Sequence, residues 1–133
     1  MHFWLIKTEP EVWSWENQKK KGIEKWNGVR NYQARNHMKA MKIGDLALFY
    51  HTGEAREIVG LVEVVKEHYP DENPNFVCID VKIYKQLNKK VTLGEIKSNP
   101  SFQGLPLIKQ SRLSVMPIDE ESYKEIMKMA FCS

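Results

Sequence analysis

Three strand-like segments follow one another through the middle of this chain, and only short turns separate them. They span residues 45–51, 57–68 and 76–84 and are rich in branched and aromatic residues, as β-strands are. No long helical segment lies between them. The chain therefore predicts a mainly antiparallel sheet that curls into a small barrel.

The flanking segments add two more strands and several helices to this prediction. Apolar runs at 2–8 and 112–118 extend the sheet. Gly60, in the segment 57–68, predicts a bulge or a close backbone approach. Asn27-Gly28 is a strong turn signal. The expected fold class is α+β, with about five strands. Helices are expected over residues 15–21, 30–41, 93–99 and 120–130, the third of them capped by Thr92 and Glu95.

Length and composition fit one globular domain over residues 1–133. Of these residues, 42% are hydrophobic and 28% are charged, so the chain has enough apolar surface for a core and is not of the disordered class. No stretch approaches the roughly 20 apolar residues of a membrane span. We expect no membrane association, and a monomer is the default expectation.

The N-terminus and the cysteines indicate a cytoplasmic protein. Residues 1–10 are apolar but short, and they lack both a basic leader and a small-residue cleavage site. Cys78 and Cys132 lie far apart in the sequence. Without a secretion signal, both are expected to be reduced thiols.

The segment WNGVRNYQARN, residues 26–36, has the most unusual composition in the chain. It holds a Trp, a Tyr, two Arg, three Asn and a Gln, and Val29 and Ala34 are its only aliphatic residues. Aromatic rings and guanidinium groups stack on flat ligands, and amides hydrogen-bond to the edges of such ligands, so this mixture suits a nucleobase. A buried polar turn that joins two elements would explain the same composition, and residue types alone leave both alternatives open.

Aromatic residues are concentrated in the first 50 positions. Trp4 and Phe49 lie in strand-like apolar runs and are best explained by core packing, whereas Trp26 and Tyr32 flank a polar turn. Stacking a base on an aromatic ring gains about 1–3 kcal/mol, and extruding that base from a duplex costs a few kcal/mol. Further contacts must therefore decide the affinity. Trp26 and Tyr32 are the expected stacking pair, and Asn31 and Gln33 are the expected edge contacts.

The charge distribution supports an anionic partner only modestly. The net charge is +3, and residues 1–43 carry nine Lys or Arg against four Asp or Glu, while residues 44–80 carry two against eight. Residues 81–133 carry nine Lys or Arg against five Asp or Glu, and if the two basic blocks share a face, that face attracts phosphates. The candidate phosphate-binding residues are Arg30, Arg35, Lys39 and Lys42.

No motif for a metal, a cofactor or catalysis is present. The four histidines are scattered without CxxC or HxxxH spacing, and the glycines form no phosphate-binding loop. Glu9 and Glu63 are better explained as separate surface groups than as a catalytic pair, and Lys7 or Glu9 is a possible partner for the Arg30 region. We expect no metal, no cofactor and no enzymatic activity.

Five ordered blocks resemble the EVE domain family of the PUA-like superfamily. They are FWLIKTEP, WNGVRNYQARN, MKIGDLALFYH, IVGLVEVVKEHYPD and RLSVMPI, and they cover the chain from Phe3 to about Ala130. The resemblance implies a PUA-like fold, which is a small, mostly antiparallel β-barrel of about five to six strands with surrounding helices. It also implies a non-enzymatic module that binds a modified base in DNA, such as 5-methylcytosine, flipped into a pocket.

By motif position, the resemblance implies twelve pocket residues in this chain. Thr8 stands where many family members have Ser, and Thr52 also replaces a common Ser; both changes are mild but bear on a tight pocket. The same superfamily includes RNA-binding domains, so tRNA or rRNA is the alternative partner, and a small-molecule enzyme is a third hypothesis. The implied pocket residues are Lys7, Thr8, Glu9, Trp26, Val29, Arg30, Asn31, Tyr32, Gln33, Phe49, Tyr50 and His51.

Overall fold

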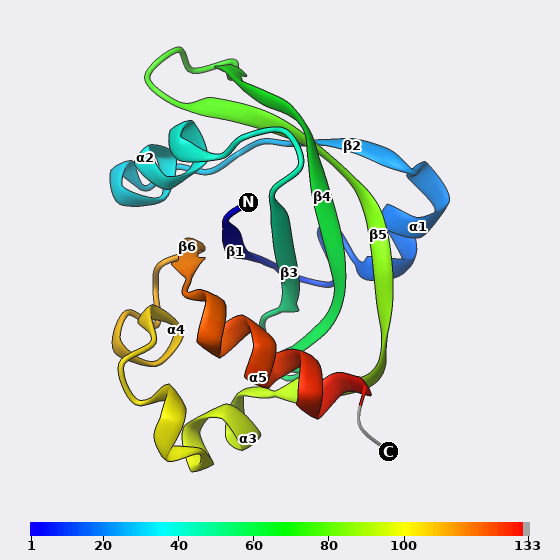
Figure 1. The fold of residues 1–133 in the computed structure, drawn as a ribbon. Helices are drawn as coiled ribbons and strands as arrows, with labels where there is room; N and C mark the ends of the chain where they lie inside the picture. The colour runs from blue at the N-terminus through cyan, green and yellow to red at the C-terminus, as the bar shows by residue number, and fades with distance from the viewer. Residues whose placement is uncertain (132–133) are drawn as a thin grey trace.

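The computed structural model describes residues 1–131, which form a six-stranded sheet with helices packed around it (Figure 1). This confirms the α+β class. The strands are β1 (Phe3–Thr8), β2 (Ile23–Trp26), β3 (Leu46–His51), β4 (Glu57–Pro70), β5 (Val77–Thr92) and β6 (Val115–Ile118). The helices are α1 (Trp15–Lys21), α2 (Tyr32–Ala40), α3 (Leu93–Ser98), α4 (Pro106–Lys109) and α5 (Glu120–Phe131), with a 3-10 turn at Pro100–Phe102.

The sheet is mostly antiparallel, as predicted, but its closure into a barrel is not confirmed. The strand order is β2-β5-β4-β3-β1-β6, and β1 and β3 form the single parallel pair among the described strands. Within residues 1–131, β2 and β6 stand at the two edges and do not pair with each other. Figure 1 shows the long strands β4 and β5 bending together, so the sheet is curved but open.

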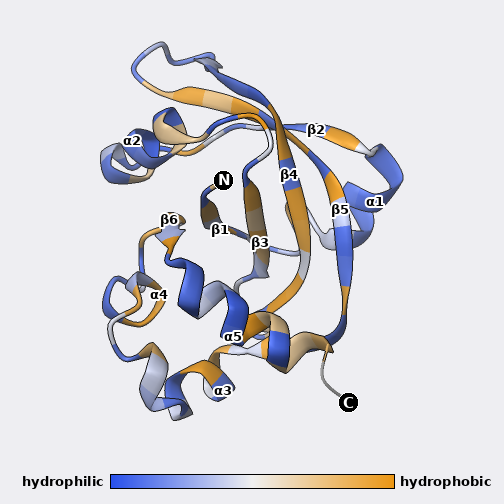
Figure 2. Ribbon diagram, viewed as in Figure 1, coloured by the Kyte–Doolittle hydropathy of each residue, from blue (hydrophilic) through white to orange (hydrophobic). Residues whose placement is uncertain are grey.

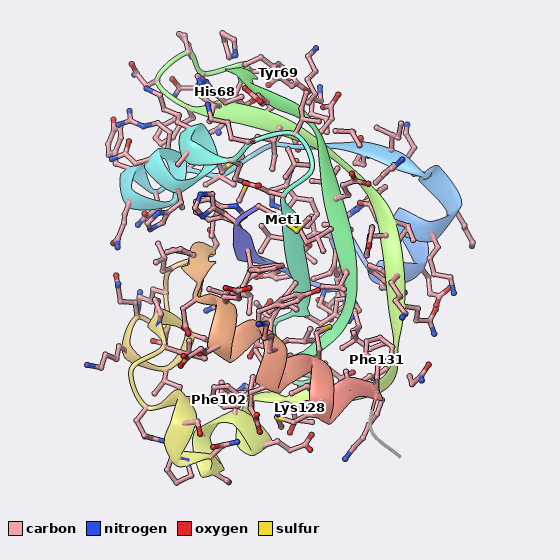
Figure 3. The ribbon with its side chains drawn as sticks, in the orientation of Figure 1. Met1, His68, Tyr69, Phe102, Lys128 and Phe131 are labelled. Atoms are coloured by element: carbon pink, nitrogen blue, oxygen red, sulfur yellow. The ribbon has the colours of Figure 1, made fainter. Side chains whose placement is uncertain are left out.

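The central strands β1 and β3 are buried on both faces of the sheet, because successive side chains of a strand point to opposite faces. Leu48 and Phe49 of β3 and Leu5 and Ile6 of β1 are fully buried, and Figure 2 shows these strands as mainly hydrophobic while α1 and α2 are mainly hydrophilic. Phe102 is also fully buried and lies near α5 at the end of the molecule opposite the β4–β5 turn (Figure 3).

Two features of the sheet differ from the sequence prediction. β2 was not predicted, because its four residues, IEKW, include two charged side chains and make a very short run; it forms by pairing with β5, where Trp26 lies opposite Ile79. β5 continues eight residues beyond the predicted end at Tyr84. The polar residues of this extension are held by β4, whose Glu57 lies opposite Thr92.

The structure confirms both features predicted at Gly60, a bulge in β4 and a close approach to the backbone. The β3–β4 register shifts beside it, since Phe49 lies opposite Gly60 and Tyr50 lies opposite Ile58. The Trp15 ring covers the Gly60 backbone so closely that an added Cβ would lie 2.2 Å from Trp15 Cη2. No side chain fits at this position without moving the ring.

The close approach predicts a large effect for Gly60→Ala. The new methyl group must displace the Trp15 ring from a packed core, and overpacking of this kind costs about 1–3 kcal/mol. Urea denaturation of Gly60→Ala and of the control Gly104→Ala measures the free energy of unfolding. A Cβ at Gly104 meets no atom within 4 Å, so the control should change little, and equal stability of the two variants would contradict the steric argument.

Candidate nucleic-acid interface

A cavity of about 380 Å³ lies where β1 and β2 end. It brings Lys7 and Thr8 of the KTEP block together with the first half of WNGVRNYQARN, and fifteen residues separate the two blocks in the sequence. Its lining comprises Lys7, Thr8, Val12, Trp13, residues 24–31 and Ser114.

Trp26 forms part of the cavity wall from a position that is mostly buried. It is the last residue of β2, only 7% of its surface is exposed, and its ring meets Phe49 edge-on at 5.5 Å between centroids. Phe49 itself is fully buried and contacts Trp15 in the same edge-on manner at 5.1 Å. The wall at Trp26 is therefore fixed by the aromatic core behind it.

Trp13 is a second tryptophan of the cavity, and it was absent from the predicted pocket residues. The Thr8 hydroxyl donates to the Trp13 carbonyl at 2.8 Å, and Trp13 Nε1 donates to Gln18 Oε1 at 2.9 Å. Gln18 is fully buried in α1 and also donates to the Gly22 carbonyl. Trp13 lay in the aromatic-rich first 50 residues, but nothing local distinguished it from a core residue.

The turn between β4 and β5 holds the loop that follows Trp26. The Asp71 carboxylate accepts hydrogen bonds from the Gly28 backbone at 3.0 Å and from Arg30 Nη1 at 2.9 Å. Gly28 has φ of +78°, which is favourable for glycine alone and agrees with the predicted turn. Arg30 therefore pairs with Asp71, whereas the sequence had pointed to Lys7 or Glu9 as its possible partner.

Asp71 is held in its charged form by these contacts. Burial raises the pKa of its carboxyl, since only 4% of the side chain is exposed. The hydrogen bonds from Arg30 and Gly28 outweigh burial and leave the pKa below its usual range. We call this arrangement, in which the Asp71 carboxylate holds the Gly28 amide and the Arg30 guanidinium, the Asp71 clamp. It is a buried anion that is stabilised by its donors.

Tyr32, one of the two expected stacking residues, lies outside the cavity lining. Tyr32 is 57% exposed, and its ring stacks on Phe76 at 5.0 Å between centroids, while the Arg35 guanidinium lies 4.8 Å from the Tyr32 ring centre. Arg35 also donates to the Asn75 carbonyl at 3.1 Å. Tyr32 and Arg35 of α2 thus pack against the β4–β5 turn, which lies beside α2 in Figure 1. His68 and Tyr69, which are labelled in Figure 3, lie next to this turn.

The remaining predicted residues are divided among different positions. Asn31 lines the cavity and also caps α2, because its Oδ1 accepts from the Ala34 backbone at 2.9 Å. His51 Nε2 accepts from the Trp15 backbone at 3.0 Å, and burial lowers the pKa of His51, which suits a neutral acceptor. Among the others, Glu9, Gln33, Tyr50, Lys39 and Lys42 do not line the cavity.

The described residues offer no obvious metal site or membrane span. Within residues 1–131, no group of three or more His, Cys, Asp or Glu is placed to hold a metal ion. None of the helices in that part of the chain is both long enough and apolar enough to cross a bilayer. Cys78 is a buried free thiol, and Cys132 lies outside the described residues.

Fold and cavity together define an α+β module with a ligand-sized pocket walled by tryptophan and bordered by cationic side chains. The EVE domain model matches residues 2–129. The chain therefore belongs to the EVE domain family.

Solved structures and curated relatives agree with this assignment. Protein Atu2648 from Agrobacterium tumefaciens has a TM-score of 0.96 and 44% identity, covering 98% of this chain and 94% of that one. Human thymocyte nuclear protein 1 is 31% identical over 168 residues, covering 95% of this chain and 72% of the human protein. The human THYN1 structure in complex with 5-methylcytosine-containing DNA has a TM-score of 0.90 and 29% identity, covering 100% of this chain and 99% of that one.

The clamp predicts that Asp71→Asn lowers stability in a pH-dependent manner. Charge-assisted hydrogen bonds contribute about 1.5–3 kcal/mol, reduced here toward about 1–2 kcal/mol because Arg30 is 45% exposed. The folded-state pKa of Asp71 lies below the ordinary 3.8, so its contribution is fully present above about pH 5 and declines as the pH falls through the folded pKa.

Urea denaturation at pH 7 and pH 3 measures this difference. The stability gap between the wild type and Asp71→Asn should be larger at pH 7 than at pH 3. Glu72→Gln is the control, since Glu72 is exposed in the same turn and should show a smaller gap at both pH values. A gap for Asp71→Asn that is unchanged by pH would contradict the clamp.

Proposed function

We propose that this chain recognises a modified cytosine in DNA by accepting the extruded base into the cavity between Trp13 and Trp26. The observation that carries the proposal is that cavity itself, which joins two tryptophans, polar groups and cations at one site. The human relative that was solved with 5-methylcytosine-containing DNA supports the same ligand class.

The size and lining of the cavity suit a pyrimidine base. Its 380 Å³ falls within the range of about 300–1,000 Å³ for small-ligand sites. The Asn31 carbonyl oxygen is used in capping α2, which leaves the amide NH₂ to donate to a base edge. The side chains of Val12 and Val29 line the same space and supply apolar contacts for a methyl group.

The charge at the cavity favours a nucleic acid over a neutral ligand. Lys7, Lys25 and Arg30 line it, and Glu24 is the one acidic residue among the lining residues. Burial lowers the pKa of Lys7, which makes a nearby phosphate a favourable partner for its charged form. Asp71 offsets the charge of Arg30, so Lys7 and Lys25 against Glu24 leave a small positive excess, which attracts the backbone that carries the base.

Titration of labelled oligonucleotides tests the proposal. Two DNA strands that differ in one 5-methylcytosine, each single-stranded and duplex, are compared at fixed salt with RNA of matched sequence. A methyl group is worth about 1–3 kcal/mol in a fitted pocket, so the modified DNA should bind about 5- to 150-fold more tightly. Equal affinity for modified and unmodified DNA would overturn base recognition, and tighter binding of RNA would favour the alternative partner.

Two aromatic variants locate the binding site. Trp13→Ala removes a cavity wall and should abolish most of the preference for the modified strand. Tyr32→Ala removes an aromatic ring of the same motif that lies outside the cavity, and it should retain the preference. The reverse result would move the base to Tyr32, and thermal unfolding of both variants shows that each is folded.

We further propose that the chain acts as a non-enzymatic monomer in the cytoplasm. Recognition by stacking and hydrogen bonding needs no catalytic group, and the buried Cys78 thiol suits a reducing compartment. Sedimentation equilibrium should give the mass of one chain, 15.6 kDa, and a concentration-dependent increase toward twice that mass would contradict the monomer.

A further inference from the structure

A second cavity, of about 320 Å³, lies beside the first and shares Lys7 with it. It is bordered by the loop after β3, by α3 and by Ser111. Three of its lining residues are cations, namely Lys7, Arg56 and Lys97, and none of its lining residues is Asp or Glu. The second cavity is therefore more uniformly positive than the first.

Lys7 lies at the boundary between the two cavities. Its Nζ donates to the Ser111 carbonyl at 3.0 Å and lies 5.7 Å from the centre of the Tyr50 ring. Both Ser111 and Tyr50 belong to the second cavity. The Lys7 side chain therefore lines both cavities, and its amine contacts residues of the second.

Arg56 is held in the second cavity by an unusual backbone conformation. Its φ is +46°, the one positive value among the non-glycine residues that the structure describes, and such strained residues are concentrated at functional sites. Its Nε donates to the Gly53 carbonyl at 3.1 Å, and its own carbonyl accepts from the Leu93 backbone at 2.8 Å. These two contacts leave the terminal nitrogens of the guanidinium for a ligand.

The three cations have no carboxylate partner among residues 1–131. Their neighbours behave differently, since Lys89 pairs with Glu95 and Lys90 pairs with Glu57 at 3.5 Å and 3.3 Å. Three like charges around one hollow repel one another, and an anion between them removes that repulsion.

We propose that the second cavity binds a phosphate group, and that this group is the phosphodiester adjacent to the base held in the first cavity. The assignment to a backbone phosphate rests on the proposed function, because it places the base on the other side of Lys7. Arg56 and Lys97 then set the position of the strand, while the first cavity discriminates the base.

Charge-removing variants of the second cavity test this proposal. Arg56→Gln and Lys97→Gln should weaken binding to modified and unmodified DNA by the same factor, about three- to tenfold at low salt. The slope of log affinity against log salt should fall by about one for each cation removed. Lys20→Gln makes the same change of charge at an exposed residue of α1 outside both cavities and should change affinity by less than about twofold.

A neutral linkage locates the phosphate along the strand. Replacing the phosphodiester next to the 5-methylcytosine with a methylphosphonate should weaken wild-type binding at least as much as Arg56→Gln does, because it removes the charge that all three cations surround. The same replacement should weaken Arg56→Gln less than it weakens the wild type, since one of the three cations around the phosphate is already absent in that variant. Full sensitivity of both proteins to the neutral linkage would overturn the assignment.

The outcomes separate this inference from the proposed function. If Arg56→Gln and Lys97→Gln bind like the wild type while 5-methylcytosine is still preferred, the phosphate site is wrong and base recognition stands. If no strand is preferred but both variants weaken all strands, base recognition is wrong and the phosphate site stands. If inorganic phosphate shifts the Arg56 Nε–H NMR resonance and the methylphosphonate has no effect, the site takes free phosphate and the backbone assignment is overturned.

Discussion

The contact between the Trp15 ring and the bare backbone of Gly60 organises this molecule. Because Gly60 has no side chain, the ring lies directly on β4 and meets Phe49 of β3 edge-on. Phe49 in turn supports Trp26 at the end of β2. One missing Cβ therefore lets three aromatic rings pack in series, from the centre of the sheet to the wall of the cavity, and this series gives the cavity a rigid back.

The rim of the cavity depends on a different principle, which is the burial of one charge. Asp71 lies in the turn of a hairpin that is remote in sequence from the WNGVRN loop, yet its carboxylate gathers a backbone amide and a guanidinium from that loop. A buried carboxylate is costly unless donors surround it. The hydrogen bonds to Asp71 therefore hold the loop in place. Arg30 both binds the hairpin and lines the cavity.

The two halves of WNGVRNYQARN, for which residue types left two explanations open, take different positions in the structure. Its first half lines the cavity, while Tyr32 and Arg35 in its second half pack against Phe76 and Asn75. Composition was unable to separate the halves, because stacking on a protein ring and stacking on a base need the same side chains. Trp13 was missed for the converse reason: its neighbours gave no sign that Thr8 and Gln18 would hold it at the cavity.

Local patterns in the sequence determined the α+β class, the three central strands, the capped helices, the turn at Gly28 and the irregularity at Gly60. Each of these depends on the alternation, capping or backbone freedom of neighbouring residues, and the motif order added the family. Only the tertiary structure decided that IEKW becomes a strand, that β5 continues to Thr92, that the described sheet is open, and which residues meet at the two cavities. Those features depend on partners distant in the chain, such as β5 for β2, Asp71 for Arg30 and Ser111 for Lys7, and no local pattern encodes the distance between residues that folding brings together.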